Sequence, residues 1–119
     1  MPKTREQRRA LDAWEQVQTV KANPKLANDD YKSWARSFPT MVLMDGLPQA
    51  LAFLAERAGK DDAAKAYLRH LQRWVTEEEN RSMLTKDYAL KDSAALRDCT
   101  AKTLAYAQWL KRFASAELQ

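Results

Sequence analysis

The sequence has little glycine, little proline and no isoleucine, and these shortages favour helices over strands. Glycine occurs twice and proline four times in 119 residues, whereas Ala, Leu, Lys, Arg, Glu and Gln are frequent. These frequent residues have high helix propensity, so we expect an all-α protein. A chain of this length buries roughly two-thirds of its unfolded surface, and we expect a single helical domain over residues 1–119.

Cysteine and histidine are equally scarce, which limits the chemistry that the chain can perform. Cys99 and His70 are single occurrences, so a disulfide framework and a Cys-rich zinc site are excluded. The motifs of phosphate-binding loops, dinucleotide sites and zinc proteases are absent. We therefore predict a packing or surface role for His70, a small semi-buried side chain at Cys99, and no catalytic residue, metal or cofactor.

Long apolar runs are also missing. The first fourteen residues, MPKTREQRRALDAW, are charged and lack the apolar stretch of a signal peptide. No run approaches the roughly 20 apolar residues that span a membrane. The sequence therefore predicts a cytoplasmic protein without membrane contact.

The hydrophobic periodicity predicts about six helices packed in one compact bundle. Thr4 and Gln7 fit a capping box that starts a helix ending near Lys21. Later helices are expected to begin at Asn28 to Asp30, Pro39, Gly46, Asp61 or Asp62, near Met83, and at Asp92 or Ser93. The polar stretch Glu77 to Asn80 is expected to be a loop or a frayed helix end. The tryptophans Trp14, Trp34, Trp74 and Trp109 fall on or near the predicted inner faces, so we expect them in the core.

The most apolar stretch, FPTMVLMDGLPQALAFLAER, is interrupted by Gly46 and Pro48. Proline inside a helix costs about 3 kcal/mol and glycine about 1 kcal/mol more. Both costs shrink if the helix is broken or kinked here, with Asp45 as the cap and Pro48 in the first turn. We therefore predict a broken central pair, from Pro39 to Met44 and from Gly46 to Ala58, which Gly59 ends as the residue after the cap.

Positive charge is concentrated in three places, although the net charge is only +4. The clusters are Lys3, Arg5, Arg8 and Arg9; Lys65, Arg69 and Arg73; and Lys111 with Arg112. The second cluster has a spacing of four, which places its cations on one helix face about 6 Å apart. This distance between cations is similar to the distance between phosphates of a nucleic-acid backbone, so the cluster could contact such a backbone. The alternative for each of the three clusters is an ordinary solvated helix face without a ligand.

Four segments carry a resemblance to a known family. They are TREQRRALDAWEQV, YKSWARSFPTMVLMDGLPQALAFLAER, AYLRHLQRWV and AKTLAYAQWLKRFASAEL. In this order they are similar to the small subunit of the type III-B CRISPR RNA-targeting effector, the Cmr complex, and the resemblance extends over essentially the whole chain. The stretch from Pro39 to Leu54 is the most specific. The chain departs from the family pattern at Asp45, where asparagine is common, and at Pro48.

The resemblance implies a non-catalytic structural subunit of a guide-RNA complex for antiviral defence. Its implied partners are the other effector subunits, the backbones of the guide and target RNA, and further copies of itself stacked in a filament. We assign the RNA contact to Arg9, Lys65, Arg69, Arg73, Lys111 and Arg112. Two alternatives stay open: a helical protein–protein adaptor without nucleic acid, and a DNA-binding regulator that reads bases through the helix containing Gln72.

Overall fold

The computed structural model describes residues 3–23, 25, 28–79 and 93–118, and over these residues it is entirely helical outside the connecting turns. Its helices are α1 (Arg5–Ala22), α2 (Asn28–Asp45), α3 (Leu47–Ala58), α4 (Asp62–Glu79) and α6 (Ser93–Glu117). The predicted all-α class is confirmed for this part of the chain. The described residues contain five helices rather than about six, and the short helix expected near Met83 lies outside them.

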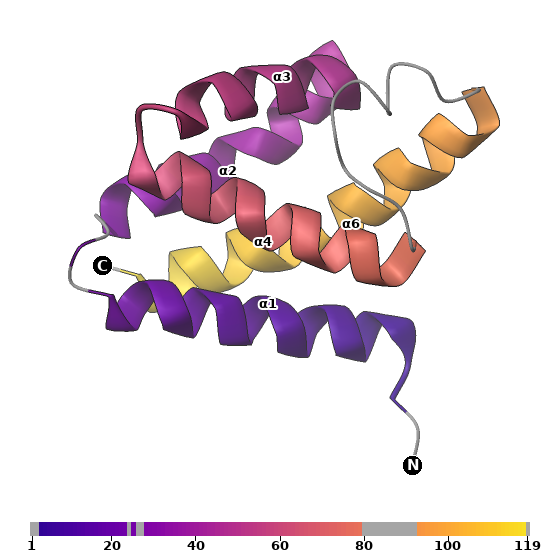
Figure 1. The fold of residues 1–119 in the computed structure, drawn as a ribbon. Helices are drawn as coiled ribbons and strands as arrows, with labels where there is room; N and C mark the ends of the chain where they lie inside the picture. Colours follow the sequence, from indigo (N-terminus) through magenta and orange to yellow (C-terminus); the bar gives the residue numbers. More distant parts are fainter. Residues whose placement is uncertain (1–2, 24, 26–27, 80–92, 119) are drawn as a thin grey trace.

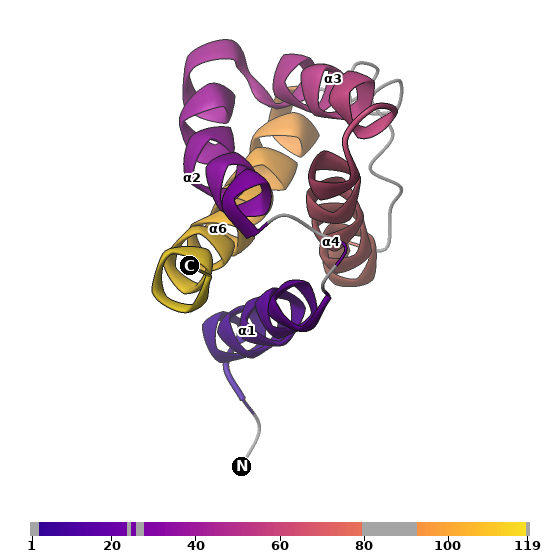
Figure 2. The same cartoon turned by 90° about the vertical axis from the view of Figure 1, so that its left-hand side faces the viewer.

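The long helix α6 crosses the molecule, and the other helices pack around it (Figure 1). α1 lies along one side of α6, while α2 and α3 form the opposite side (Figure 2). α6 contacts α1, α2 and α4, and α4 also packs against both α2 and α3. The hydrophobic core therefore lies between α6 and helices α1, α2 and α4, and α3 closes it by packing on α2 and α4.

The centre of the core is rich in aromatic side chains. Tyr31, Phe38, Tyr67 and Tyr106 are all fully buried. The Tyr67 ring meets those of Tyr31 and Phe38 edge to face, with centroids 5.6 and 5.5 Å apart. This is the geometry that aromatic quadrupoles prefer, so the rings fix how α2 and α4 pack.

The first helix begins as the sequence predicts. The Gln7 backbone N–H donates to the Thr4 hydroxyl at 3.1 Å, and the Thr4 N–H donates to the Gln7 side chain at 2.8 Å. Ala13, Val17 and Val20 then form the buried stripe. The prediction that Trp14 lies in the core is wrong, because this side chain lies beside the buried stripe and is 42% exposed.

The second helix does not end before Pro39 as predicted. α2 runs without interruption from Asn28 to Asp45 with Pro39 inside it. Pro39 has no N–H for the Ala35 carbonyl, a loss worth about 3 kcal/mol in an exposed helix. Here Tyr31, Phe38 and Val42 on the same helix are buried, and burying side chains of this kind contributes roughly 1.5–3 kcal/mol each. Burial of this face therefore offsets the proline.

The predicted break at Gly46 is confirmed. α2 ends at Asp45 and α3 begins at Leu47, so a single residue turns the chain, with φ of 88° at Gly46. This left-handed value is favourable only for glycine. Pro48 falls in the first turn of α3, where a missing N–H costs little. The predicted cap at Asp45 is wrong, because Gly46 is the N-cap and no side chain supplies the cap hydrogen bond.

The ends of α3 and α4 follow the prediction in part. Gly59 follows the end of α3, but it is right-handed with φ of −71° and so is not a left-handed terminator. Asp61 caps α4, because its carboxylate accepts the Ala63 N–H at 2.9 Å. α4 then continues to Glu79 instead of stopping near Thr76, since glutamate is itself a good helix former.

Candidate nucleic-acid interface

Two cations of the predicted row on α4 line one surface hollow. Lys65 and Arg69 are exposed and, together with Gln72 and Leu68, border a depression of about 420 Å³ beside the α3–α4 turn at Gly59. They are one helical turn apart, so both charges point into the same space. A concave surface with two cations and an amide side chain is chemically suited to an anionic ligand such as a phosphate backbone.

The third cation of the row is held differently. The Arg73 guanidinium binds both carboxylate oxygens of Asp12 on α1. The Tyr106 hydroxyl of α6 donates to the same carboxylate at 2.5 Å. Asp12 therefore joins α1, α4 and α6 at one point, and Arg73 is half-buried within this junction. No sequence pattern indicated this pairing, because the two residues are far apart in the chain.

Arg9 lies in a second polar junction of α1. It is 8% exposed and donates to Glu6 at 2.5 Å. The Trp109 indole N–H of α6 donates to the other Glu6 oxygen at 3.0 Å. The hydrogen bond from Arg9, followed by that from Trp109, lowers the pKa of the Glu6 carboxyl. Arg9 is therefore a buried residue that faces the α1–α6 contact.

Lys111 and Arg112 lie near the end of α6, on a different helix from the α4 row. Arg112 is exposed and Lys111 is half-exposed. The rings of Trp109 and Phe113 stack on each other, with their centroids 5.7 Å apart. The six predicted residues thus divide into four with solvent access at a helix surface and two, Arg9 and Arg73, within polar helix junctions.

His70 has a packing role, as predicted. It is 7% exposed, and its Nδ1 atom shares a hydrogen bond of 2.7 Å with the Tyr31 hydroxyl. Burial, reinforced by the positive charges of Arg69 and Arg73, lowers the pKa of His70 from 6.5 to about 4. Cys99 is likewise buried. Within the described ranges no three His, Cys, Asp or Glu side chains are close enough to hold a metal ion.

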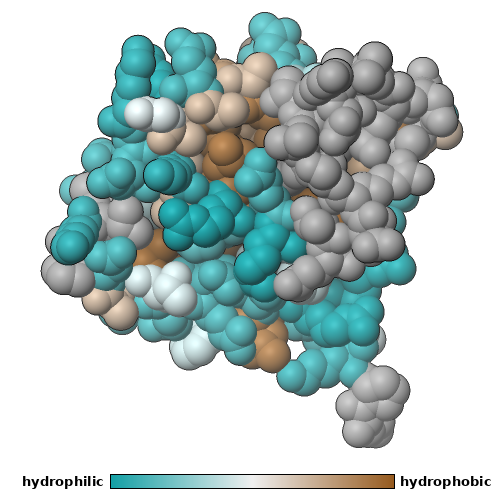
Figure 3. Space-filling model, in the orientation of Figure 1, coloured by the Kyte–Doolittle hydropathy of each residue, from teal (hydrophilic) through white to brown (hydrophobic). Residues whose placement is uncertain are grey.

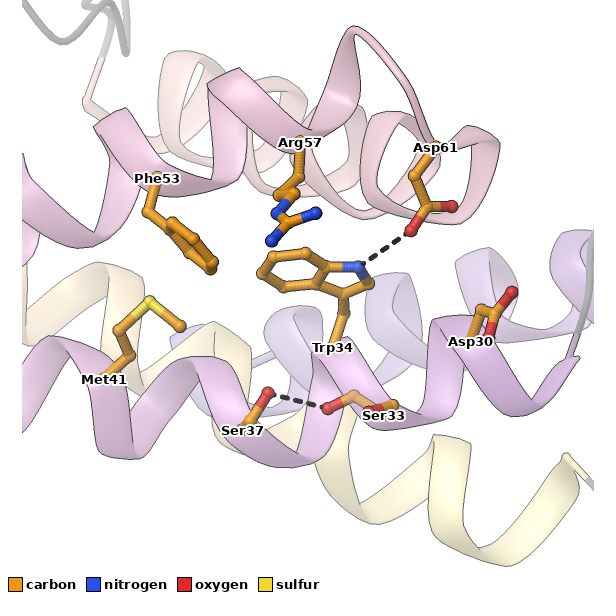
Figure 4. Close-up of a pocket in the computed structure, with 8 residues that line it drawn as sticks. All are labelled: Asp30, Ser33, Trp34, Ser37, Met41, Phe53, Arg57 and Asp61. Carbon is orange, nitrogen blue, oxygen red and sulfur yellow. Dashed lines mark hydrogen bonds between the residues drawn. The ribbon is translucent and has the colours of Figure 1, made fainter.

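A second groove, between α2 and α3, was missed by the sequence interpretation. Figure 4 shows its aromatic wall, where the Trp34 and Phe53 rings lie 5.8 Å apart. The Arg57 guanidinium lies 5.5 Å from the Phe53 ring centroid, and the Trp34 indole N–H points to Asp61 at 3.4 Å. The spacing of four between Phe53 and Arg57 on one helix was the available signal. Trp34 is half-buried here and not in the core centre as expected.

None of the described helices is both long and apolar enough to cross a membrane. On the face drawn in Figure 3 the described surface is mainly hydrophilic, with only small apolar patches. The structure thus defines a small helical protein with a basic hollow on α4 and no metal cluster among the residues described.

Comparison with known proteins identifies the family of this small helical protein. A family model described as "CRISPR-associated protein (Cas_Cmr5)" matches residues 5–117. A crystal structure of a CRISPR-associated Cmr5 family protein from Thermus thermophilus superimposes with a TM-score of 0.81 and 30% sequence identity, covering 98% of this chain and 100% of that one. The chain belongs to the Cmr5 family, whose members are small subunits of the type III-B Cmr complex. The resemblance found in the sequence is confirmed.

Proposed function

We propose that this protein is a non-catalytic structural subunit of a cytoplasmic CRISPR effector complex that holds RNA through its phosphate backbone. The guide and target RNA strands are the proposed ligands, and the copies of the subunit stack beside them as a filament. Family membership supports the place in an effector complex. The observation that carries the RNA contact is the hollow in which Lys65 and Arg69 present two adjacent charges.

The six predicted RNA-binding residues have different parts in this proposal. Lys65, Arg69 and Arg112 are exposed and Lys111 is half-exposed, so these four are available to phosphates. Arg73 is bound by Asp12, and Arg9 is buried beside Glu6. We assign Arg9 and Arg73 to shaping the basic surface, because Arg9 is itself buried, and moving Arg73 to a phosphate would take its charge away from the largely buried Asp12 carboxylate.

The test is charge reversal of the hollow in the assembled complex. We expect Lys65→Glu with Arg69→Glu to weaken RNA retention and to reduce the slope of log affinity against log salt by about 2, one for each lost phosphate contact. The measurement is filter binding of labelled RNA to complex reconstituted with its partner subunits over a salt series. Arg36→Glu, an exposed single reversal on α2 outside the hollow, is the control and should retain the wild-type slope.

Wild-type retention and slope in the reversed variant, with assembly intact, would contradict the RNA contact at this hollow. That outcome favours the adaptor function, in which the protein contacts only other proteins. A specific feature also speaks for protein contact: Leu43 and Met44 at the end of α2 are 70% and 79% exposed. Salt-insensitive assembly with unchanged RNA retention is the expected signature of that alternative.

A further inference from the structure

The groove between α2 and α3 has no part in the proposed RNA contact, and its chemistry differs from that of the basic hollow. It has a volume of about 330 Å³, at the low end of the range for small-molecule sites. A space of this size suits one or two side chains of a bound protein better than a complete small ligand. The residues at its two ends indicate which side chains such a protein presents.

One end of the groove is apolar. Met41 of α2 and Phe53 of α3 lie on opposite walls, and the Trp34 ring lies beside them (Figure 4). The Arg57 guanidinium covers the Phe53 ring, 5.5 Å from the ring centroid. Arg57 is exposed, and a cation–π contact at an exposed site is weak, so this side chain can move aside. An apolar side chain of a partner can therefore pack between Met41 and Phe53.

The other end of the groove is acidic (Figure 4). Asp30 of α2 is exposed, and within the described part of the chain its carboxylate takes part in no hydrogen bond or ion pair. Asp61 caps α4 with one carboxylate oxygen and receives the Trp34 indole N–H on the other at 3.4 Å. This distance is longer than that of a usual N–H···O bond, so the second oxygen can accept a stronger donor. A cationic side chain at this end would meet two carboxylates.

The charge around the groove argues against a nucleic-acid occupant. Residues 28–62, which include the whole lining of the groove, contain six Asp or Glu and four Lys or Arg side chains, whereas the chain has a net charge of +4. The groove thus lies in an acidic segment of a basic protein. Phosphates at its acidic end would be repelled by Asp30 and Asp61, whereas a cationic side chain of a protein is attracted by the same carboxylates.

We propose that this groove docks a different protein subunit of the effector complex, through a segment that pairs an arginine with a neighbouring apolar side chain. The apolar side chain packs between Met41 and Phe53, and the guanidinium binds Asp30 and Asp61. Arginine fits this end better than lysine, because its planar fork can donate to more than one carboxylate oxygen and stacks on aromatic faces. The inference rests on the proposed place in an effector complex, but not on the RNA contact, and adds the surface and the chemistry of the docked segment.

Photo-crosslinking in the complex reconstituted with its partner subunits tests the occupant directly. The probe is p-benzoylphenylalanine in place of Phe53, whose ring is 38% exposed at the apolar end of the groove. We expect a cross-link to one other protein subunit, mapped by mass spectrometry to an apolar residue that has an arginine close to it in sequence. A cross-link to RNA, to a second copy of this chain or to a segment without arginine overturns the proposal, and so does the absence of any cross-link.

Two pairs of substitutions distinguish the carboxylates in the groove from those just outside it. Asp30→Asn with Asp61→Asn neutralises the groove, and α4 keeps its start because asparagine caps a helix as well as aspartate does. Asp29→Asn with Asp62→Asn is the matched control, since it removes the same charge from the starts of the same two helices at exposed positions outside the groove. The groove pair should lower the cross-linking yield about fivefold, the loss expected for two exposed ion pairs, and the control pair should retain the yield. Equal yields from the two pairs overturn the role of the groove carboxylates.

RNA retention by the same complexes reports separately on the proposed function. Neither pair of substitutions changes Lys65 or Arg69, so the groove variant should lose the cross-link and retain RNA. Charge reversal of Lys65 and Arg69 should do the opposite. Failure of the cross-link with normal RNA retention therefore contradicts the docking groove alone, whereas unchanged RNA retention after charge reversal contradicts the RNA contact alone.

Discussion

The two halves of this bundle are held together by different kinds of interaction. Where α2 packs on α4, the contact is aromatic and apolar, with Tyr31, Phe38 and Tyr67 fully buried. Where α1 packs on α6 and α4, polar pairs accompany the core residues, including the Asp12 junction and the Glu6 junction. A third pair, Lys21 with Glu117 at 3.4 Å, lies near the end of α1.

The difference shows how the bundle divides stability and specificity. Buried rings contribute stability roughly in proportion to the area they remove from water. A carboxylate such as Asp12 requires Arg73 and Tyr106 at fixed positions, so it defines the position of α1 along its neighbours more than it strengthens the contact. Substitutions in the two halves should therefore change the free energy of unfolding by different amounts. These changes should also depend differently on salt and pH.

The largest effect is expected in the aromatic half. Phe38→Ala removes a fully buried ring that packs against Tyr67 and leaves a cavity. We expect the free energy of unfolding to fall by about 3–5 kcal/mol. Urea denaturation followed by circular dichroism measures it, with Phe53→Ala, at a 38% exposed ring, as the milder control. Equal losses at the two positions would contradict the proposed importance of the aromatic half.

The same half should respond to acid through His70. Its pKa is about 4 when folded and 6.5 in an ordinary setting. The unfolded chain therefore takes up the proton first as pH falls, and stability is complete above pH 6.5 and declines toward pH 4, by on the order of 3 kcal/mol. Arg69 and Arg73 disfavour the charged ring, while Asp12 opposes them.

Urea denaturation at a series of pH values tests this decline. His70→Gln keeps a hydrogen-bonding group near Tyr31 but cannot titrate, so its stability should depend less on pH over the same interval. Wild type and variant contain the same carboxylates, so the contribution of these groups to the pH dependence cancels in the difference between the two stability curves. Parallel curves for wild type and variant would show that His70 does not titrate as its burial requires.

A smaller effect is expected where α1 is attached. Asp12→Asn removes the charge that Arg73 and Tyr106 share, and hydrogen bonds to charged groups contribute about 1.5–3 kcal/mol. We expect a loss of about 2 kcal/mol that shrinks in high salt, because the Arg73 side chain is 37% exposed and the pair is partly screened. A loss independent of salt would assign the effect to packing instead of charge.

Features confined to a few neighbouring residues could be predicted from the sequence. The Thr4–Gln7 capping box and the break at Gly46 depend on local backbone chemistry, and both are confirmed. Pro39 was misjudged because a helix-breaking residue can be retained where tertiary burial outweighs the lost hydrogen bond. No local signal distinguished a continuous α2 from two shorter helices.

The candidate site was only partly accessible to sequence reasoning. The spacing of Lys65, Arg69 and Arg73 placed three cations on one face, and two of them line the hollow. The ion pair between Arg73 and Asp12 could not be predicted, because ion pairs between helices that are far apart in the sequence leave no periodic pattern. Trp14 illustrates the same limit: it lies beside the buried stripe, and a period of 3.6 residues does not define how wide that stripe is.

The single-residue turn at Gly46 also protects the protein against exchanging helices with a neighbour. If α2 and α3 fused, residues 28–58 would form one rod about 46 Å long at the usual rise per residue, and α3 would have to dock on another copy. Pro48 disfavours this, because inside such a rod its ring would collide with the carbonyl of Met44. The residue pair that bends the chain thus also disfavours domain swapping, which helps each copy to keep its own α3 when copies lie close together.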